Sequence, residues 1–280
     1  MTAVSSLWIG DSLSPLERAC VQSFLNRGYQ FDLYAYEPIA HVPAGCRVLD
    51  AAGILPESSI IRYARGPGKG SVALFANMFR YKLLHEVGGW WVDMDMFCLS
   101  QTLPDTGVVL AQEDRNGLNC AIMRFPQGHD AMRVAYDECV MRSDDVDWGD
   151  TGPRLLTRLA TQFGLTGSIF PEPVFYPIHF SNFWLIFDPR RTTYAAEKIR
   201  SAACVHLWHN LIGRAGLDLH VRPPAGSLLY NMYEWTIGTA NFAREYVLAP
   251  EAPMDSVRLQ IRPCGGTQEH PAASTSTPAQ

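Results

Sequence analysis

The sequence lacks the features that mark several large classes of protein. Its net charge is −5 and charged residues make up 18%, so it has no basic excess for contacts with a phosphate backbone, and we expect no nucleic-acid partner. No apolar run approaches the ~20 residues that a membrane helix needs, so no transmembrane segment is predicted. The first residues carry no basic region, and Asp11 soon interrupts the apolar stretch from Leu7, which is unlike a secretory signal.

Cysteine pairs at metal-binding spacing are also missing. The seven cysteines are odd in number and scattered, and none are spaced as Cys-x-x-Cys, so we expect neither a zinc site nor a disulfide framework. A cytoplasmic location fits this pattern. No Gly-x-Ser-x-Gly occurs, so a serine-hydrolase elbow is unsupported.

One glycine-rich basic stretch, residues 62–71, resembles a phosphate loop only superficially. Lys69 is followed by Gly70 instead of Ser or Thr, and no glycine lies five residues before it. Two interpretations remain open: a mobile connector, or a loop that lies near a diphosphate.

The hydrophobic content of 47% over 280 residues predicts one large domain. We place it at residues 1–262 and expect the polar, Pro/Ser/Thr-rich residues 263–280 to be a disordered tail. Apolar periodicity and capping signals predict an α/β fold that starts with a βαβ unit. The expected strands are 7–10, 29–36, 46–49, 90–97, 108–110 and 120–123, and the expected helices are 14–26, 72–87, 130–141, 151–163 and 193–202.

Two aspartates within residues 88–97 are the most informative feature of the chain. Asp93 and Asp95 follow a double glycine and stand among Trp, Val, Met and Phe. On a continuous strand Trp91, Asp93 and Asp95 face the same side, with the two aspartate Cα atoms ~6–7 Å apart. Because buried carboxylates are costly without a compensating charge, the pattern predicts a divalent cation with a bound phosphate.

The preceding helix, residues 72–87, carries two kinds of side chain. Val72, Phe75, Phe79 and Leu83 form an apolar stripe, whereas Asn77 and Arg80 share a different face. Arg80 has two interpretations: a surface ion pair, or a contact with the hydroxyls or phosphate of a ligand.

Residues 75–84 followed by 88–95 resemble the signature of the DXD sugar-transferase family. This family contains retaining glycosyltransferases of the GT-A fold, among them capsular and lipopolysaccharide enzymes, yeast mannosyltransferases and the Gb3-synthase-like α-1,4-galactosyltransferases. Its pattern is Ser-Asp-x-x-Arg-Tyr, a helical stretch, Gly-Gly, an aromatic residue and Asp-x-Asp. The spacing is matched over more than twenty residues, although Asn77 stands where the family has an aspartate. The resemblance implies a GT-A type, Rossmann-like mixed α/β sheet with helical additions.

Three further segments extend the resemblance. Residues 7–10 resemble the first strand of these enzymes, whose Trp stacks on the nucleotide base; residues 148–153 resemble a Gly-acid-Thr-Gly-Pro element; and residues 205–208 resemble a His/Trp element that closes over the diphosphate and metal. Each has a plainer alternative. Trp8, His206 and Trp208 are equally explained as core residues, and Asp150 as an acid at a helix N-terminus.

The resemblance implies a metal-dependent retaining glycosyltransferase that uses a nucleotide sugar, with UDP-sugars favoured. It assigns Mn²⁺ or Mg²⁺ to Asp93, Asp95 and His206. It places the donor at a further set of residues: Trp8, Gly10, Asn77, Arg80, Asn119 and Trp208. The residues expected to act in catalysis are Asp93, Asp95, Arg80 and Asp150, with a covalent or a front-face mechanism left open.

The expected acceptor is a glycan or glycolipid, as in polysaccharide biosynthesis, with peripheral contact at the inner face of the membrane. Two rivals remain: a nucleotide-sugar hydrolase with water as acceptor, and a catalytically silent nucleotide- or glycan-binding module, which the replacement at Asn77 makes conceivable.

Overall fold

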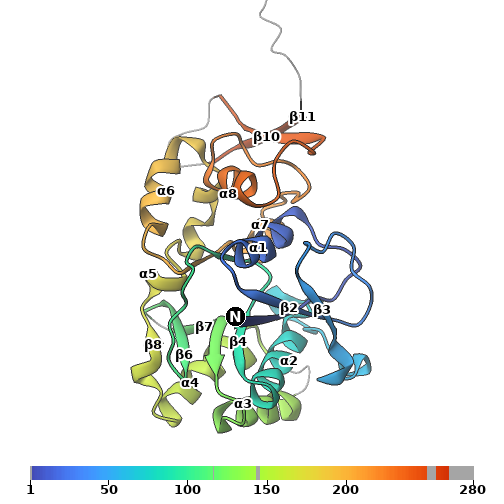
Figure 1. The fold of residues 1–280 in the computed structure, drawn as a ribbon, viewed down its shortest axis with the longest axis vertical. Helices are drawn as coiled ribbons and strands as arrows, with labels where there is room; N and C mark the ends of the chain where they lie inside the picture. The colour runs from blue at the N-terminus through green and yellow to red at the C-terminus, as the bar shows by residue number, and fades with distance from the viewer. Residues whose placement is uncertain (1, 116, 143–145, 251–256, 265–280) are drawn as a thin grey trace, which may run out of the picture.

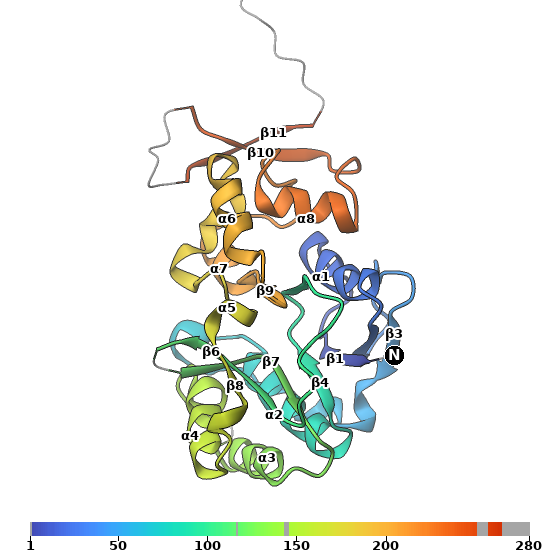
Figure 2. The same cartoon turned by 60° about the vertical axis from the view of Figure 1, so that its left-hand side comes forward.

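A seven-stranded sheet forms the centre of the molecule, and its strand order is β3-β2-β1-β4-β7-β6-β8 (Figures 1 and 2). The computed structural model describes residues 2–115, 117–142, 146–250 and 257–264. Every strand of this sheet except β7 runs in the same direction. The strands are β1 (Ala3–Leu7), β2 (Gln30–Ala35), β3 (Arg47–Asp50), β4 (Gly89–Val92), β6 (Val109–Asp114), β7 (Gly117–Phe125) and β8 (Ile169–Phe170). The predicted mixed α/β sheet is therefore confirmed.

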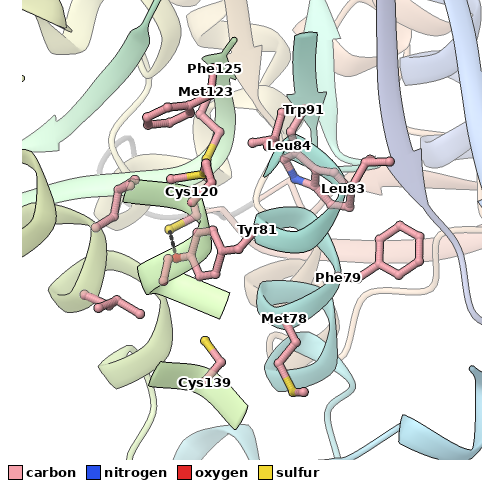
Figure 3. Close-up of a cluster of buried hydrophobic side chains, with 14 of the residues drawn as sticks. Met78, Phe79, Tyr81, Leu83, Leu84, Trp91, Cys120, Met123, Phe125 and Cys139 are labelled. Carbon is pink, nitrogen blue, oxygen red and sulfur yellow. Dashed lines mark hydrogen bonds between the residues drawn. The ribbon is translucent and has the colours of Figure 1, made fainter. Parts of the chain in front are cut away.

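Helices cover both faces of the sheet. One face packs against α2 (Ala73–Glu86), α3 (Asp130–Arg142) and α4 (Leu155–Gln162), and the other against α1 (Pro15–Asn26) and α5 (Glu172–Phe175). The predicted apolar stripe is confirmed for Phe75, Phe79 and Leu83, which have no exposed surface, whereas Val72 precedes the helix and is half-buried. Figure 3 shows how side chains of α2 pack beside Trp91 and Cys120.

The start of α1 follows directly from its sequence. Ser14 is the N-cap, Pro15 occupies the first helical position, and Glu17 completes a capping box by accepting a hydrogen bond from the Ser14 amide at 2.9 Å. The helix ends before Gly28, which adopts a φ of +86° that favours glycine. This confirms the predicted helix 14–26.

The later part of the chain forms a second layer above the sheet, at the top of Figure 1. Its core also includes Leu16 and Cys20 of α1, and Phe97. Its strands are β5 (Met96–Cys98), which pairs with β9 (Cys204–His206), and the hairpin of β10 (Arg244–Leu248) and β11 (Leu259–Pro263). Its helices are η6 (Phe180–Phe187), η7 (Pro189–Arg191), α6 (Thr192–Ile199), α7 (His209–Arg214) and α8 (Leu228–Thr236).

Short helical turns make up the remaining elements. They are η1 (Ala51–Gly53), η2 (Glu57–Ser59), η3 (Gly66–Gly68), η4 (Asp150–Arg154) and η5 (Thr166–Ser168). The tail was predicted to begin at residue 263, but the ordered chain continues past that position. Pro263 ends β11, and the Cys264 amide donates to the Ala243 carbonyl at 3.0 Å. Residues 265–280, the rest of the predicted tail, and residues 143–145 of the acidic loop lie outside the described residues.

Two strand predictions need correction. The first strand is Ala3–Leu7 rather than 7–10, because the serines at its centre weaken the apolar signal of a strand that is buried between β2 and β4. The predicted strand 90–97 is interrupted: β4 ends at Val92, and the Met96 amide donates to the Asp93 carbonyl at 3.0 Å across a turn. Asp93 and Asp95 therefore do not share one face of a continuous strand.

Candidate active site

A cavity of about 880 Å³ opens beyond the carboxyl ends of β1 and β4. In the sheet order β2 lies on one side of β1 and β4 on the other, so the strand order reverses at this place. Open α/β sheets bind ligands at such a switch point, because the loops after the two strands diverge there. The site residues predicted from sequence that line the cavity are Trp8, Asn77, Arg80, Asp93, Asp95, Asn119, His206 and Trp208.

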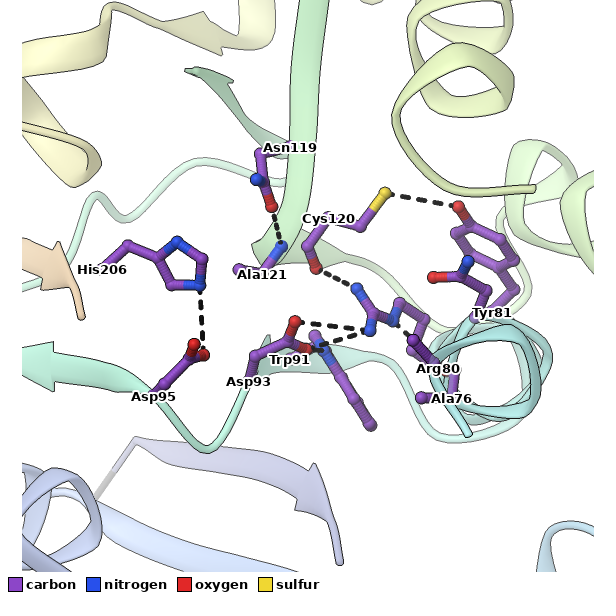
Figure 4. Close-up of polar contacts among 12 residues, drawn as sticks. Ala76, Arg80, Tyr81, Trp91, Asp93, Asp95, Asn119, Cys120, Ala121 and His206 are labelled. Atoms are coloured by element: carbon purple, nitrogen blue, oxygen red, sulfur yellow. Dashed lines mark hydrogen bonds and ion pairs between the residues drawn. The ribbon is translucent and has the colours of Figure 1, made fainter. Parts of the chain in front are cut away.

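Arg80 is held at the wall of the cavity by four groups, one of which is the Ala76 carbonyl, to which its Nε donates at 3.2 Å (Figure 4). Its Nη1 donates to the Cys120 carbonyl at 2.7 Å, its Nη2 lies 3.0 Å from Oδ1 of Asp93, and its guanidinium lies 5.1 Å from the centre of the Trp91 ring. The residue is only 5% exposed, so the predicted ion pair exists but is buried and not on the surface. The guanidinium thereby fixes the position of the Asp93 carboxylate.

Asp93 receives a second donor from its own strand. The indole Nε1 of Trp91 donates to Oδ1 of Asp93 at 2.7 Å, so these two side chains do face the same side, as predicted. Burial raises the pKa of Asp93, and Asp95 raises it further, while Arg80 and the Trp91 indole act in the opposite direction. The carboxylate is thus partly buried, with 29% of its side chain exposed, at a cost that a bound cation would relieve.

Asp95 lies on the turn after Asp93 and is held by residues at the end of β9. Nε2 of His206 lies 3.1 Å from Oδ1 of Asp95 (Figure 4). The His209 amide donates to Oδ2 at 2.9 Å. Burial would raise the pKa of Asp95, but His206 and His209 outweigh it and the pKa is lowered. Burial likewise lowers the pKa of His206, but Asp95, Asp93 and Glu113 outweigh it and the pKa is raised. Asp95 is therefore held as a carboxylate.

The arrangement has room for a cation that also binds a phosphate. Among the residues that the structure describes, no three His, Cys, Asp or Glu side chains form a ready-made metal site. The oxygens of Asp95 and Asp93 are the hard donors that Mg²⁺ and Mn²⁺ prefer. Nε2 of His206 is engaged with Asp95, and its Nδ1 lies on the side of the ring away from the two carboxylates (Figure 4). These groups fit an ion whose remaining ligands come from a diphosphate.

Two asparagines lie on the same cavity. Nδ2 of Asn77 donates to Oγ1 of Thr151 at 3.2 Å, and its Oδ1 accepts no hydrogen bond within the described part of the chain. Nδ2 of Asn119 donates to Oε2 of Glu113 at 2.5 Å, and its Oδ1 accepts from the Ala121 amide. Asn77 therefore retains an acceptor for a ligand hydroxyl, whereas Asn119 is already engaged on both sides.

The structure favours the plainer alternative for two predicted residues. The indole Nε1 of Trp208 donates to the Ile178 carbonyl at 2.9 Å, so it is not directed at a diphosphate. Asp150 accepts a hydrogen bond from the Asp147 amide and pairs with Arg154, and it is not among the residues that line the cavity. It acts as an acid at the start of a helix, where the unpaired amides favour negative charge.

The segment after β1 brings Trp8 to the mouth of the cavity, with its Nε1 donating to the Ser12 carbonyl at 3.1 Å. Gly10 does not line the cavity itself. A Cβ at Gly10 would lie 3.1 Å from Nε1 of Trp8, and its φ is +153°, so a glycine here lets the loop pass close under the indole. Of the loop 62–71, Tyr63 and Ser71 line the cavity, whereas Lys69 does not.

Sequence reasoning missed several acidic and basic residues that line the cavity or support it. Glu113 lines the cavity from β6, and His209, which also lines it, lies 2.9 Å from the buried carboxylate of Glu17. Glu113 stands in a segment with no motif. The one available signal was the position of His209 three residues after His206.

Glu113 is the cavity carboxylate best suited to a ligand hydroxyl, because its Oε1 accepts no hydrogen bond from the described residues. We expect Glu113→Gln to raise the KM for the substrate that it contacts about tenfold, since a hydrogen bond to a charged group contributes roughly 1.5–3 kcal/mol. Steady-state kinetics with each substrate varied in turn will measure this. The control is Glu57→Gln, an exposed acid outside the cavity. KM values within twofold of the wild type for both substrates would argue against the role.

Comparison with known proteins shows what part of the chain is similar to. Residues 124–229 match the family model of the alpha 1,4-glycosyltransferase conserved region. The match includes the segments 148–153 and 205–208 that carried part of the resemblance, and it begins after the Asp-x-Asp segment. The predicted resemblance to glycosyltransferases is therefore confirmed over this region.

Particular relatives extend this result. The lactosylceramide 4-alpha-galactosyltransferases of Rattus norvegicus and Homo sapiens are each 26% identical to the chain over 141 residues, which are 46% of this chain. The match covers 39% of the rat protein and 40% of the human one, so the chain spans about two fifths of the length of these relatives.

Solved structures of glycosyltransferases are also similar, at low identity. PaToxG glycosyltransferase is similar over 59% of this chain and 71% of its own, with 14% identity and a TM-score of 0.45. Galactosyltransferase LgtC is similar over 74% of this chain and 87% of its own, with 13% identity and a TM-score of 0.40. Within the described residues, no helix combines the length and the apolar character that crossing a bilayer requires.

Proposed function

We propose that this protein is a metal-dependent glycosyltransferase that moves a sugar from a nucleotide sugar to a glycan or glycolipid, with retention of configuration. The observation that carries the proposal is the cavity at the switch point of the sheet, where Asp93, Asp95 and His206 lie together. The family match over residues 124–229 supports the class of reaction.

The roles follow from the geometry of the chain's own groups. Mn²⁺ or Mg²⁺, when bound, would neutralise charge on the diphosphate leaving group. Asp95, ionised and held by His206 and the His209 amide, would be its main protein ligand, with Asp93 as the second carboxylate. Trp8 at the mouth offers a face for the nucleotide base, and Oδ1 of Asn77 offers an acceptor for a sugar hydroxyl.

Arg80 acts mainly through Asp93 in this arrangement. Its Nε and Nη1 are engaged with the carbonyls of Ala76 and Cys120, and its Nη2 faces Asp93. We therefore propose that it orients a carboxylate of the cation site, while a direct contact with the donor stays a prediction. Asp150, the carboxylate expected to act directly, lies off the cavity, and we propose departure and attack on the same face of the sugar.

The substrates are proposed from the relatives' names alone. These name galactose as the transferred sugar and lactosylceramide as the acceptor. For this chain we propose a UDP-hexose donor and a galactose-ended acceptor as the first pair to test. A cytoplasmic location and a role in polysaccharide assembly stay predictions.

A nucleotide-release assay separates the proposal from its rivals. We expect Mn²⁺-dependent release of UDP from a UDP-sugar that increases severalfold when an acceptor saccharide is added. A rate of UDP release that is the same with and without the acceptor would identify a hydrolase. Nucleotide binding without release, from every donor tried, would identify a silent binding module, and either result contradicts transfer.

A further inference from the structure

The buried carboxylate of Glu17 has more partners than helix capping requires. Its Oε2 accepts the Ser14 amide in the capping box, and this exchange takes place at a helix end, where capping acids are ordinarily exposed to water. Glu17, however, has no exposed surface. Burying a carboxylate carries a substantial cost unless charge or hydrogen bonds compensate it. The burial therefore points to a second role for this side chain.

That second partner is His209. Nδ1 of His209 lies 2.9 Å from Oε1 of Glu17, which is the distance of an ion pair, although the angle does not meet hydrogen-bond geometry. Within the described residues Glu17 has no lysine or arginine partner. His209 is the first residue of α7 and is partly exposed on the cavity. The contact thus links α1 to the edge of the candidate active site.

The backbone just before His209 is held in an unusual conformation. Trp208 has φ 58° and ψ 47°, in the left-handed region that is unfavourable for a residue other than glycine. Such a conformation persists only when its surroundings fix it. Two contacts do so here: the Trp208 indole donates to the Ile178 carbonyl, and Glu17 holds the ring of the next residue.

The consequence of this conformation is a set of contacts on Asp95. The Leu207 amide donates to the Asp95 carbonyl at 2.9 Å, and the His209 amide donates to Oδ2 of Asp95 at 2.9 Å. Nε2 of His206 also lies beside Oδ1 of Asp95. Residues 206 and 209 thus hold the Asp95 carboxylate, and residue 207 holds its backbone. The orientation of Asp95 therefore depends on the position of this segment.

We propose that Glu17 is a positioning residue: through His209 it holds the segment 206–209 so that the Asp95 carboxylate is fixed for a divalent cation and its bound diphosphate. This inference rests on the proposed function, because it concerns the cation site. Residues that orient metal ligands from behind typically change metal affinity by about 10–100-fold when they are replaced. Glu17 and His209 lie outside the motif that predicted the site.

A double-mutant cycle tests the link with Mn²⁺ and UDP as the probe. Glu17→Gln keeps the size of the side chain and an oxygen for the Ser14 amide, and His209→Ala keeps the backbone amide that contacts Asp95. We expect each variant to weaken binding of UDP in saturating Mn²⁺ about tenfold by calorimetry. The double variant should bind no more weakly than the weaker single one, because both changes break the same link.

The control is Asp188→Asn, which alters another fully buried acid that pairs with Arg190 and does not line the cavity. We expect this control to lower the melting temperature and leave UDP affinity unchanged. The same double-mutant cycle is measured a second time by urea denaturation of the unliganded protein. The shifts in the urea midpoint caused by Glu17→Gln and His209→Ala should again be non-additive.

The outcomes distinguish this inference from the proposed function. A wild-type protein that binds no UDP in the presence of Mn²⁺ overturns the proposed function, and the urea midpoints still decide whether Glu17 acts through His209. Wild-type binding together with unchanged binding by Glu17→Gln, or additive effects in the cycle, overturns the role of Glu17 alone.

Discussion

Replacing Asp95 with asparagine is expected to reduce transfer by about a thousandfold or more, since a bound cation contributes several kcal/mol to stabilising a developing charge and each 1.36 kcal/mol is a factor of ten. Asparagine has the same size and keeps one oxygen for the His209 amide, but it loses the charge that attracts the cation. The fold should survive, because the contacts of Asp95 are with a backbone amide and one imidazole.

The measurement is the initial rate of UDP release at saturating Mn²⁺, with unfolding followed by circular dichroism. Asp105→Asn is the matched control: its carboxylate is 95% exposed, it pairs with Arg124 at the surface, and it does not line the cavity. Asp105→Asn should retain wild-type activity. Turnover by Asp95→Asn within threefold of the wild type would contradict the metal role of Asp95.

The second large effect concerns stability. We expect Arg80→Met to lower the free energy of unfolding by about 3 kcal/mol, near the lower end for removal of one partner of a buried ion pair. The change leaves the Cys120 carbonyl and the Asp93 carboxylate without their main donor. The estimate is kept low because the side chain of Asp93 is still 29% exposed and water can solvate part of it.

Urea denaturation measures this effect, with Arg133→Met as the control. Arg133 pairs with Asp130 and Asp137 on the exposed face of α3, and exposed pairs contribute roughly 0–1 kcal/mol. The double change Arg80→Met with Asp93→Leu should recover part of the loss, because it removes the buried carboxylate that Arg80→Met leaves unpaired. A loss below 1 kcal/mol for Arg80→Met would show that the pair is not structurally important.

Local sequence signals predicted those elements whose formation depends on neighbours in the chain. The capping box and Gly28 define the two ends of helix 14–26. The stripe of Phe75, Phe79 and Leu83 identified the buried face of α2. The resemblance placed Arg80, Asp93 and Asp95 at one site and all three line one cavity, although the continuous strand expected to align the two aspartates is interrupted. These are properties of short segments with a strong period or a strong motif.

The parts that failed depend on contacts between distant segments. β1 could not be placed from its own residues, because Ser5 and Ser6 become strand residues only between β2 and β4. The turn at Asp95 exists because residues 206–209, more than a hundred positions later, supply its donors. Glu17 carries no local sign that His209 will lie beside it.

The most direct test of the account is a crystal structure of the protein with Mn²⁺ and a UDP-sugar, with the manganese located by its anomalous scattering. The account predicts a manganese peak in the cavity, coordinated by an oxygen of Asp95 and by oxygens of both phosphates of UDP, with the uracil ring at Trp8. A nucleotide sugar bound at full occupancy with no manganese between it and Asp95, or bound outside this cavity, would contradict it.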